Sequence, residues 1–175
     1  MLIVAMAGLP GTGKSTLARA LSSALDAELL DKDALRAAKF GGGVDYSREQ
    51  DDLVLREMYA WIEELARGKE VACVIIDGRT FSQRYQTDEV RELAVRSGAR
   101  LAIIECVCEP AVARVRLEFD AQSGSHVAAN RSFELYCKLA AAADEIKGRK
   151  LVVDTAVESL EQMVERCAVF VRAGT

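Results

Sequence analysis

The sequence is poor in the side chains on which metal centres and nucleic-acid binders usually depend. It has one histidine, and its five cysteines show no paired spacing typical of metal ligands, which argues against a metal centre built from these residues. Aromatic residues make up only 6% of the 175 residues, and the net charge is −4. Both shortages argue against a broad basic surface with stacking rings for nucleic acid, although a local basic groove stays open.

Long hydrophobic segments are missing as well. No run is long enough to span a membrane, and the first residues carry no basic flank or cleavage signature. We therefore expect no targeting peptide, no membrane partner and a cytoplasmic location. Half of the residues are hydrophobic and no repeat or low-complexity linker interrupts the chain, so residues 1–175 are expected to form one domain.

The cysteines are interpreted as reduced core thiols, because most of them lie among apolar neighbours. Cys106 and Cys108 would share one face of a strand, and a weaker metal or redox role for this pair stays open. The single histidine, His126, has no partner pattern, which favours a loop contact over a catalytic base.

What the sequence does contain is a complete phosphate-binding loop, residues 8–15, directly after the apolar run 2–7. Its glycines let the backbone aim N–H groups inward, and the helix that follows adds the positive end of its dipole. Lys14 can then reach the β- and γ-phosphates, and the Ser15 hydroxyl can ligate Mg²⁺. We predict that ATP and Mg²⁺ bind here, the alternative being an ordinary glycine-rich turn. The loop residues predicted to bind the nucleotide are Gly8, Pro10, Gly11, Thr12, Gly13, Lys14, Ser15 and Thr16.

Apolar runs alternate with helical patterns along the chain. Strands are predicted at residues 2–7, 27–30, 71–76, 101–107 and 151–153, and several of these runs are continuous, as in strands covered on both faces. Helices are predicted near residues 17–25, 34–40, 53–68, 87–96, 110–119, 132–146 and 160–170, with a mobile joint at the triple glycine 41–43. The alternation predicts a three-layer α/β/α sandwich around a parallel sheet, with ligands at the carboxyl ends of the strands.

Asp33 and Arg36 follow the second predicted strand, so they are expected at the same sheet edge as the phosphate-binding loop. We predict that both contact the acceptor, with Asp33 taking the proton of its hydroxyl and Arg36 offsetting charge on the transferring group. The alternative is that Asp33 caps the next helix and Arg36 is solvated. For Asp31, capping and substrate contact are equally favoured.

Asp77 ends the third predicted strand, at the same edge. An acid at this point can hold Mg²⁺ through water or contact the acceptor. Arg79 and Arg84 lie just beyond it and are further candidates for binding the acceptor. The alternatives are a turn-forming aspartate and two solvated arginines.

A lid is predicted at about residues 110–135. Arg114 and Arg116 lie on a predicted helix, and Arg131 begins the next one after a polar stretch. A lid over phosphates needs cations and must exclude water, since water would hydrolyse the donor. Positions two apart on a helix face different ways, so Arg116 and Arg131 are preferred as catalytic phosphate contacts. Arg114 is a further candidate nucleotide contact, and solvation is the alternative for each of the three.

Together these residues resemble the small phosphate-loop kinases of the group that contains chloramphenicol phosphotransferase, zeta-toxin-type kinases and polynucleotide 5′-hydroxyl kinases. The resemblance covers nearly the whole chain and rests on residues 7–16, Asp33-x-x-Arg36, Ile76-Asp77, the lid arginines and Val153-Asp154-Thr155. Uncharacterised bacterial AAA-type ATP-binding proteins of this group are similar through residues 77–81 and 104–108.

The resemblance implies a phosphate-loop nucleoside triphosphatase fold with a five-stranded sheet in the order 2-3-1-4-5. It also implies that Asp33 is the general base, that Lys14 and the lid arginines stabilise the transition state, and that Asp154 and Thr155 lie near the adenine. Many relatives carry two lid arginines four residues apart, whereas this chain has Asp120 four residues after Arg116. The second lid contact is therefore assigned to Arg131.

The favoured function is an ATP-dependent kinase that transfers the γ-phosphate to a hydroxyl of a small molecule. A polynucleotide 5′-hydroxyl kinase is disfavoured by the acidic composition and the few aromatic residues. A third possibility is a nucleotide-dependent switch or ATPase module without an acceptor. It is disfavoured because oligomeric ATPases generally need further sensor elements and a longer chain.

Overall fold

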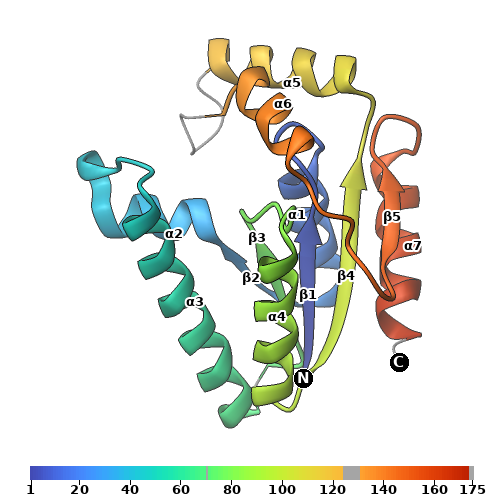
Figure 1. Cartoon of the computed structure of the whole chain (residues 1–175). Helices are drawn as coiled ribbons and strands as arrows, with labels where there is room; N and C mark the ends of the chain where they lie inside the picture. The colour runs from blue at the N-terminus through green and yellow to red at the C-terminus, as the bar shows by residue number, and fades with distance from the viewer. Residues whose placement is uncertain (70, 124–130, 174–175) are drawn as a thin grey trace.

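The computed structural model describes residues 1–69, 71–123 and 131–173. A five-stranded parallel sheet forms its centre, in the order β2-β3-β1-β4-β5, which confirms the predicted fold class and strand order (Figure 1). The strands are β1 (Leu2–Ala7), β2 (Glu28–Asp31), β3 (Cys73–Asp77), β4 (Arg100–Val107) and β5 (Leu151–Asp154).

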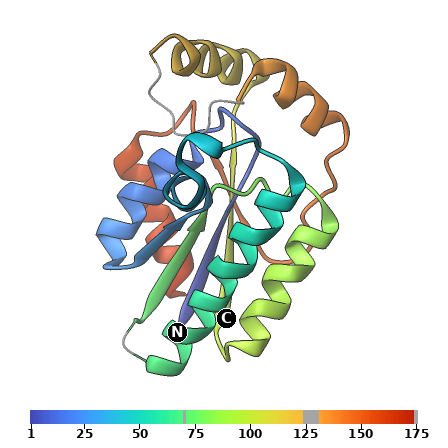
Figure 2. The same cartoon turned by 90° about the vertical axis from the view of Figure 1, so that its left-hand side faces the viewer.

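Helices cover both faces of the sheet. The described helices are α1 (Lys14–Leu25), α2 (Lys32–Phe40), α3 (Arg48–Gly68), α4 (Arg84–Arg96), α5 (Pro110–Ser123), α6 (Phe133–Ala141) and α7 (Leu160–Arg172), with a 3₁₀ turn, η1 (Gly41–Gly43), after α2. Helices α1 and α7 lie on one face, and α3 and α4 lie on the other (Figure 2). Helices α5 and α6 lie beyond the carboxyl ends of the strands, at the top of Figure 1.

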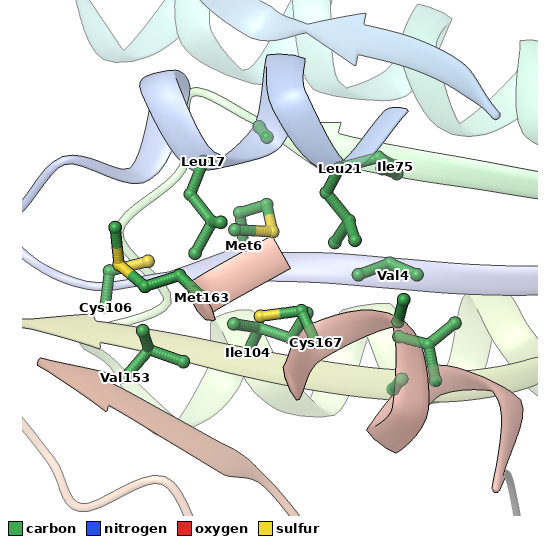
Figure 3. Packing of buried hydrophobic residues seen from close by; sticks show 14 of the residues in the cluster. Val4, Met6, Leu17, Leu21, Ile75, Ile104, Cys106, Val153, Met163 and Cys167 are labelled. Carbon is green, nitrogen blue, oxygen red and sulfur yellow. The ribbon is translucent and has the colours of Figure 1, made fainter. Parts of the chain in front are cut away.

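The alternation of side chains along β1 builds two hydrophobic cores. Val4 and Met6 face α1 and α7, where Figure 3 shows them beside Leu17, Leu21, Met163 and Cys167. The intervening residues, Ile3, Ala5 and Ala7, belong to the core under α3 and α4. All six β1 residues are buried, which explains why this strand reads as a continuous apolar run.

The cysteines are all free thiols in the structure. Cys73, Cys106 and Cys167 are buried, Cys108 is partly buried, and Cys137 is exposed. Burial raises the pKa of Cys106 to about 12, so this thiol stays protonated. Within the described residues, no group of three or more His, Cys, Asp or Glu side chains is placed to hold a metal ion. None of the helices in this part of the chain is long and apolar enough to cross a membrane.

The first four helices all begin earlier than the apolar periodicity indicated, and side-chain caps explain the starts of α3 and α4. Helix α3 starts at Arg48 rather than near Leu53, because the Ser47 side chain caps it by accepting from the Gln50 backbone N–H. Helix α4 likewise starts at Arg84, after a capping box formed by Gln83 and Gln86. Polar first turns carry no apolar signal, so these caps set helix starts that periodicity cannot reveal.

Helix α6 ends at Ala141, five residues before the predicted end at Ile146. The backbone N–H of Asp144 donates to the Ser82 carbonyl, and the Asp144 carboxylate accepts from the Arg84 backbone N–H. Ile146 is buried in the core under α3 and α4. The prediction was wrong here because Ile146 continues the apolar pattern of the helix but belongs to a loop that returns to the core.

Candidate functional site

The phosphate-binding loop joins β1 to α1 and depends on its glycines. Gly8 has a φ of +130°, and a Cβ at this position would lie 2.3 Å from the carbonyl oxygen of Cys106 on β4. Gly11 has a φ of +77°, and a Cβ there would lie 2.8 Å from the carbonyl oxygen of Ala113 on α5. Side chains are therefore excluded at both positions by backbone conformation and by neighbouring backbone atoms.

Lys14 is the first residue of α1 and its side chain is buried. Its Nζ donates to the Leu9 carbonyl over 2.8 Å, so the ammonium lies inside the curve of the loop. Burial lowers the pKa of Lys14 from 10.5 to about 8, although the Asp77 carboxylate opposes this shift, and the Arg131 guanidinium adds to it. The loop thus holds a poorly solvated cation whose charge an anionic ligand would stabilise.

A cavity of about 470 Å³, named here the phosphate-loop cavity, opens beside α1. The predicted nucleotide or catalytic residues that line it are Gly11, Gly13, Lys14, Ser15, Thr16, Arg116, Arg131 and Thr155, and its other walls are Leu17, Arg19, Asp120, Leu160 and Met163. Loop glycines, cations and a few apolar side chains of α1 and α7 therefore meet in one space, which suits a nucleotide with its phosphates on the loop.

Other residues predicted to bind the nucleotide lie outside this cavity. Gly8 and Thr12 face a separate cavity behind the loop, and Pro10 lines a third, described below. Arg114 is exposed and stacks on the Phe133 ring at 4.2 Å. The Asp154 carboxylate accepts from the Ala156 backbone N–H, so it organises the turn after β5.

The third cavity, named here the β2–α2 cavity, has a volume of about 150 Å³. Pro10, Lys14, Ser15, Gly78, Thr80, Arg131, Leu135 and Leu139 form part of its wall, and Lys32, Asp33, Arg36, Tyr46, Asp51 and Arg79 complete it. It shares Lys14, Ser15 and Arg131 with the phosphate-loop cavity. The two spaces therefore meet where the terminal phosphate of a nucleotide on the loop would lie.

Asp31 and Asp33 have different roles at the start of α2. The Asp31 carboxylate caps the helix by accepting from the backbone N–H groups of Asp33 and Ala34. Asp33 instead accepts from the Arg36 guanidinium over 2.8 Å. The helix cap that sequence analysis offered for Asp33 thus belongs to Asp31, and the Asp33 side chain lines the β2–α2 cavity.

Sequence analysis missed Lys32, Tyr46 and Asp51. Lys32 Nζ donates to Asp51 over 2.6 Å, and Arg36 forms a second ion pair with the same carboxylate oxygen. Tyr46 lies under the Arg36 guanidinium at 5.4 Å from its ring centroid. Lys32 could have been found from its position between Asp31 and Asp33, whereas no sequence signal connects Asp51 on α3 to this group.

Asp77 ends β3 with its side chain only 1% exposed. Among the described residues, its Oδ1 has no hydrogen-bond partner. Asp77 lines neither cavity, but its carboxylate acts on the Lys14 ammonium, and Ser15 lines both cavities. The Asp77 carboxylate and the Ser15 hydroxyl are a donor set that fits Mg²⁺ held jointly with phosphate oxygens.

Arg79 and Arg84 are placed differently. Arg79 is 5% exposed and lines the β2–α2 cavity, with its guanidinium bonded to Tyr59 and Glu89 at 2.7 Å each. Arg84 is exposed beside Asp88 and lies outside this cavity. The structure therefore brings Arg79, but not Arg84, to the other predicted acceptor residues.

The predicted lid arginines also differ in their partners. Arg116 donates to the Thr155 hydroxyl over 2.8 Å and to the Thr155 carbonyl over 2.9 Å. A guanidinium nitrogen of Arg131 lies 3.6 Å from a carboxylate oxygen of Asp120. Asp120 is the residue found here where many of the resembling kinases have a second lid arginine. The carboxylate at position 120 thus pairs with the arginine to which sequence analysis assigned the second lid contact. His126 lies outside the described residues.

A family of AAA domains matches residues 3–131, most of the chain. The chain belongs to this AAA domain family. The fold is similar to that of an inferred kinase from Chloroflexus aurantiacus, with a TM-score of 0.77, 21% identity and 97% of both chains covered. An APS kinase from Mycobacterium tuberculosis, solved with AMPPNP and APS, has a TM-score of 0.72 and 17% identity over 98% of this chain and 97% of that one.

A gluconokinase from Sinorhizobium meliloti has a TM-score of 0.61 and 17% identity, over 98% of this chain and 92% of that chain. These likenesses establish a phosphate-loop kinase-like fold for the AAA domain protein. A comparison with curated proteins gave no match.

Proposed function

We propose that this AAA domain protein is an ATP-dependent kinase that transfers the γ-phosphoryl group to a hydroxyl of a small-molecule acceptor. The observation that carries the proposal is the junction of two cavities at Lys14, Ser15 and Arg131. One cavity has the lining of a nucleotide site, and the other, about a third of its volume, contains a carboxylate and cations. Such an arrangement presents an acceptor to the end of a triphosphate.

In this proposal Asp33 is the general base. Its Oδ1 accepts from Arg36, and Oδ2 can accept the proton of the acceptor hydroxyl. The hydroxyl oxygen bonds to the γ-phosphorus as the bond from that phosphorus to the β–γ bridging oxygen breaks, and ADP leaves. Lys14 and Arg131 offset the negative charge that develops on the transferring group.

Ser15 and Asp77 would hold Mg²⁺ in this scheme, and the ion would supply charge neutralisation at the β- and γ-phosphates. The lid of the proposal, at about residues 110–135, includes α5 and the first residues of α6, and these two helices lie over the strand ends in Figure 1. Arg116 reaches from α5 to Thr155 beside the phosphate-binding loop. Its predicted phosphate contact would require this arginine to share its donors between Thr155 and the nucleotide.

The resemblance to chloramphenicol phosphotransferase and zeta-toxin-type kinases supports a small alcohol as acceptor. The solved neighbours are named as kinases of gluconate and APS, which are small molecules, and this agrees with the same class. A polynucleotide acceptor is less favoured because Tyr46 is the one aromatic side chain that lines the described part of the β2–α2 cavity.

The deciding experiment measures ADP formation with and without a pool of candidate alcohols, together with transfer of labelled γ-phosphate to the alcohols. A kinase forms labelled product, and its ADP formation rises with the acceptor. Lys14→Ala should abolish transfer and strongly weaken triphosphate binding, because it removes a cation from the β–γ region. Acceptor-independent hydrolysis without labelled product would instead favour the ATPase module, and labelled oligonucleotides would favour the polynucleotide kinase.

A further inference from the structure

Two arginines of the β2–α2 cavity share an unusual environment. Arg36 is 4% exposed and Arg79 is 5% exposed, although both are charged. Among the described residues, four buried side-chain polar atoms lack a hydrogen-bond partner, and two of them are the Nε atoms of these arginines. Buried donors are nearly always bonded in folded proteins, so two arginines with unpartnered Nε atoms that line one cavity favour a site in which a ligand draws their guanidinium groups toward it.

Each of these guanidinium groups also lies against an aromatic ring. The Tyr46 ring is 5.4 Å from Arg36, and the Phe81 ring is 5.7 Å from Arg79. Tyr46 and Phe81 both have positive φ, +55° and +51°, which is uncommon for bulky residues. Backbone strain of this kind persists where the surroundings impose it and clusters at ligand-binding sites. Both guanidinium groups therefore lie within cation–π distance of a ring.

Cations outnumber carboxylates among the side chains that line the cavity, although Glu89 and Asp120, outside the lining, pair with two of the cations. The described lining includes five cations, namely Lys14, Lys32, Arg36, Arg79 and Arg131, and two carboxylates, Asp33 and Asp51. Lys14 and Arg131 also line the phosphate-loop cavity, where a nucleotide would bind them. The other three cations each have a carboxylate partner. Lys32 and Arg36 share one oxygen of Asp51, Arg36 also bonds Asp33, and Arg79 bonds Glu89, so an acceptor would use the donors that these ion pairs leave over.

We propose, on the basis of the proposed function, that the acceptor is a small alcohol that carries an oxyanion, such as a carboxylate, phosphate or sulfate group. The oxyanion binds at Arg36 and Arg79, with Lys32 as a third cation, and the hydroxyl faces Asp33. Oxyanions accept several charge-assisted hydrogen bonds from arginine forks, whereas a neutral polyol offers these guanidinium groups only uncharged acceptors.

Nuclear magnetic resonance of the arginine Nε–H groups tests this binding directly. The protein is first saturated with Mg²⁺ and a non-hydrolysable ATP analogue, so that added anions do not simply occupy the phosphate-binding loop. Signals are assigned with Arg36→Lys and Arg79→Lys. D-gluconate, glycerol 3-phosphate and sulfate are then titrated, with D-glucitol and glycerol as neutral counterparts of the first two.

At least one of the anions should shift the Arg36 and Arg79 signals saturably, at a midpoint at least tenfold below that of any neutral polyol. Arg79→Gln should raise that midpoint at least tenfold, whereas the charge-matched change of exposed Arg67 to Gln on α3 should leave it unchanged. If Arg79→Gln does not fold, Arg79→Lys provides the comparison, because it retains the charge but loses the fork and should weaken binding less.

Equal midpoints for anions and neutral polyols, or no shift with any of the anions, would overturn the inference. The comparison among gluconate, glycerol 3-phosphate and sulfate distinguishes carboxylate, phosphate and sulfate recognition. Transfer to a neutral alcohol without anion binding contradicts this inference alone. Anion binding without transfer to any alcohol contradicts the kinase proposal alone, so the two failures can be told apart.

Discussion

Arg116 on α5 and Thr155 after β5 are joined by two hydrogen bonds, from one guanidinium to the hydroxyl and the carbonyl of the threonine. The Thr155 hydroxyl in turn donates to the Thr12 carbonyl over 2.9 Å. The α5 helix is therefore connected to the phosphate-binding loop through a buried threonine.

Thr155→Val should destabilise the fold by about 1–3 kcal/mol and weaken nucleotide binding several-fold, because it removes the hydroxyl that connects Arg116 to the loop. Urea unfolding and calorimetric titration with an ATP analogue measure the two effects. Thr155→Ser retains the hydroxyl and is the matched control. A stable Thr155→Val protein with unchanged affinity would show that the connection has no role in nucleotide binding.

Nucleotide binding should take up a proton at alkaline pH because of Lys14. Burial holds its pKa at about 8 in the free protein, and a bound triphosphate should raise that pKa by adding negative charge beside the ammonium. Affinity should therefore be greatest below pH 8 and fall as the pH rises above it. Below this pKa, Lys14 is protonated both before and after binding.

Calorimetry in buffers of different ionisation enthalpy measures this uptake. One pH unit above the pKa of free Lys14, uptake should approach one proton, and two units below that pKa, this residue should contribute almost none. Lys14→Arg is the control, because arginine does not titrate in this range. Equal proton uptake at both pH values would contradict the prediction that nucleotide binding raises the pKa of Lys14.

Asp33→Asn should separate binding from chemistry. Its carboxylate is proposed to contact the acceptor rather than the triphosphate, so ATP affinity should stay within a few-fold while transfer falls by about 10²–10⁴. Asp31→Ala should mainly affect stability, with a loss of about 1 kcal/mol in the free energy of unfolding because the helix cap is missing. Titration, transfer assays and melting curves distinguish the two variants. Retained phosphoryl transfer in a folded Asp33→Asn protein would rule out Asp33 as the general base.

Hydrogen exchange should report closure of α5 over the nucleotide. The backbone amides of α5 (Pro110–Ser123) should exchange more slowly with Mg²⁺ and an ATP analogue, because Arg116 and the loop are then held together by the ligand. Backbone amides of α4 provide the internal control, because no residue of this helix lines the phosphate-loop cavity or the β2–α2 cavity. Exchange in α5 that is indifferent to the nucleotide would count against a lid.

Local chemistry explains why the centre of the fold could be predicted from sequence. The buried parallel strands are continuous apolar runs, and Gly8, Gly11 and Lys14 carry a loop signature whose geometry is set by adjacent residues. Asp33, Arg36 and Arg79 were placed at the correct edge because each follows the carboxyl end of a strand.

The contacts that complete the candidate site join residues far apart in the chain, and no periodicity records them. Asp51 reaches Lys32 from a different helix, and Thr155 reaches Thr12 across 143 positions. The wrong prediction of a helix up to Ile146 has the same cause. Ile146 is buried in a core formed by distant residues, and this packing outweighs the local helix propensity. Either Asp31 or Asp33 could have capped α2, because an aspartate at either position can adopt the extended backbone conformation of a cap. In the structure Asp31 adopts it, and Asp33 lies in the first turn of the helix.

The uneven burial of the five thiols makes the protein suitable for labelling without engineering. Burial raises the pKa of Cys73 to about 11 and those of Cys106 and Cys167 to about 12, so these three resist alkylating reagents at neutral pH. Cys137 is exposed on α6. A maleimide fluorophore should therefore attach to Cys137 first, and its emission would report changes around α6 when a nucleotide is added.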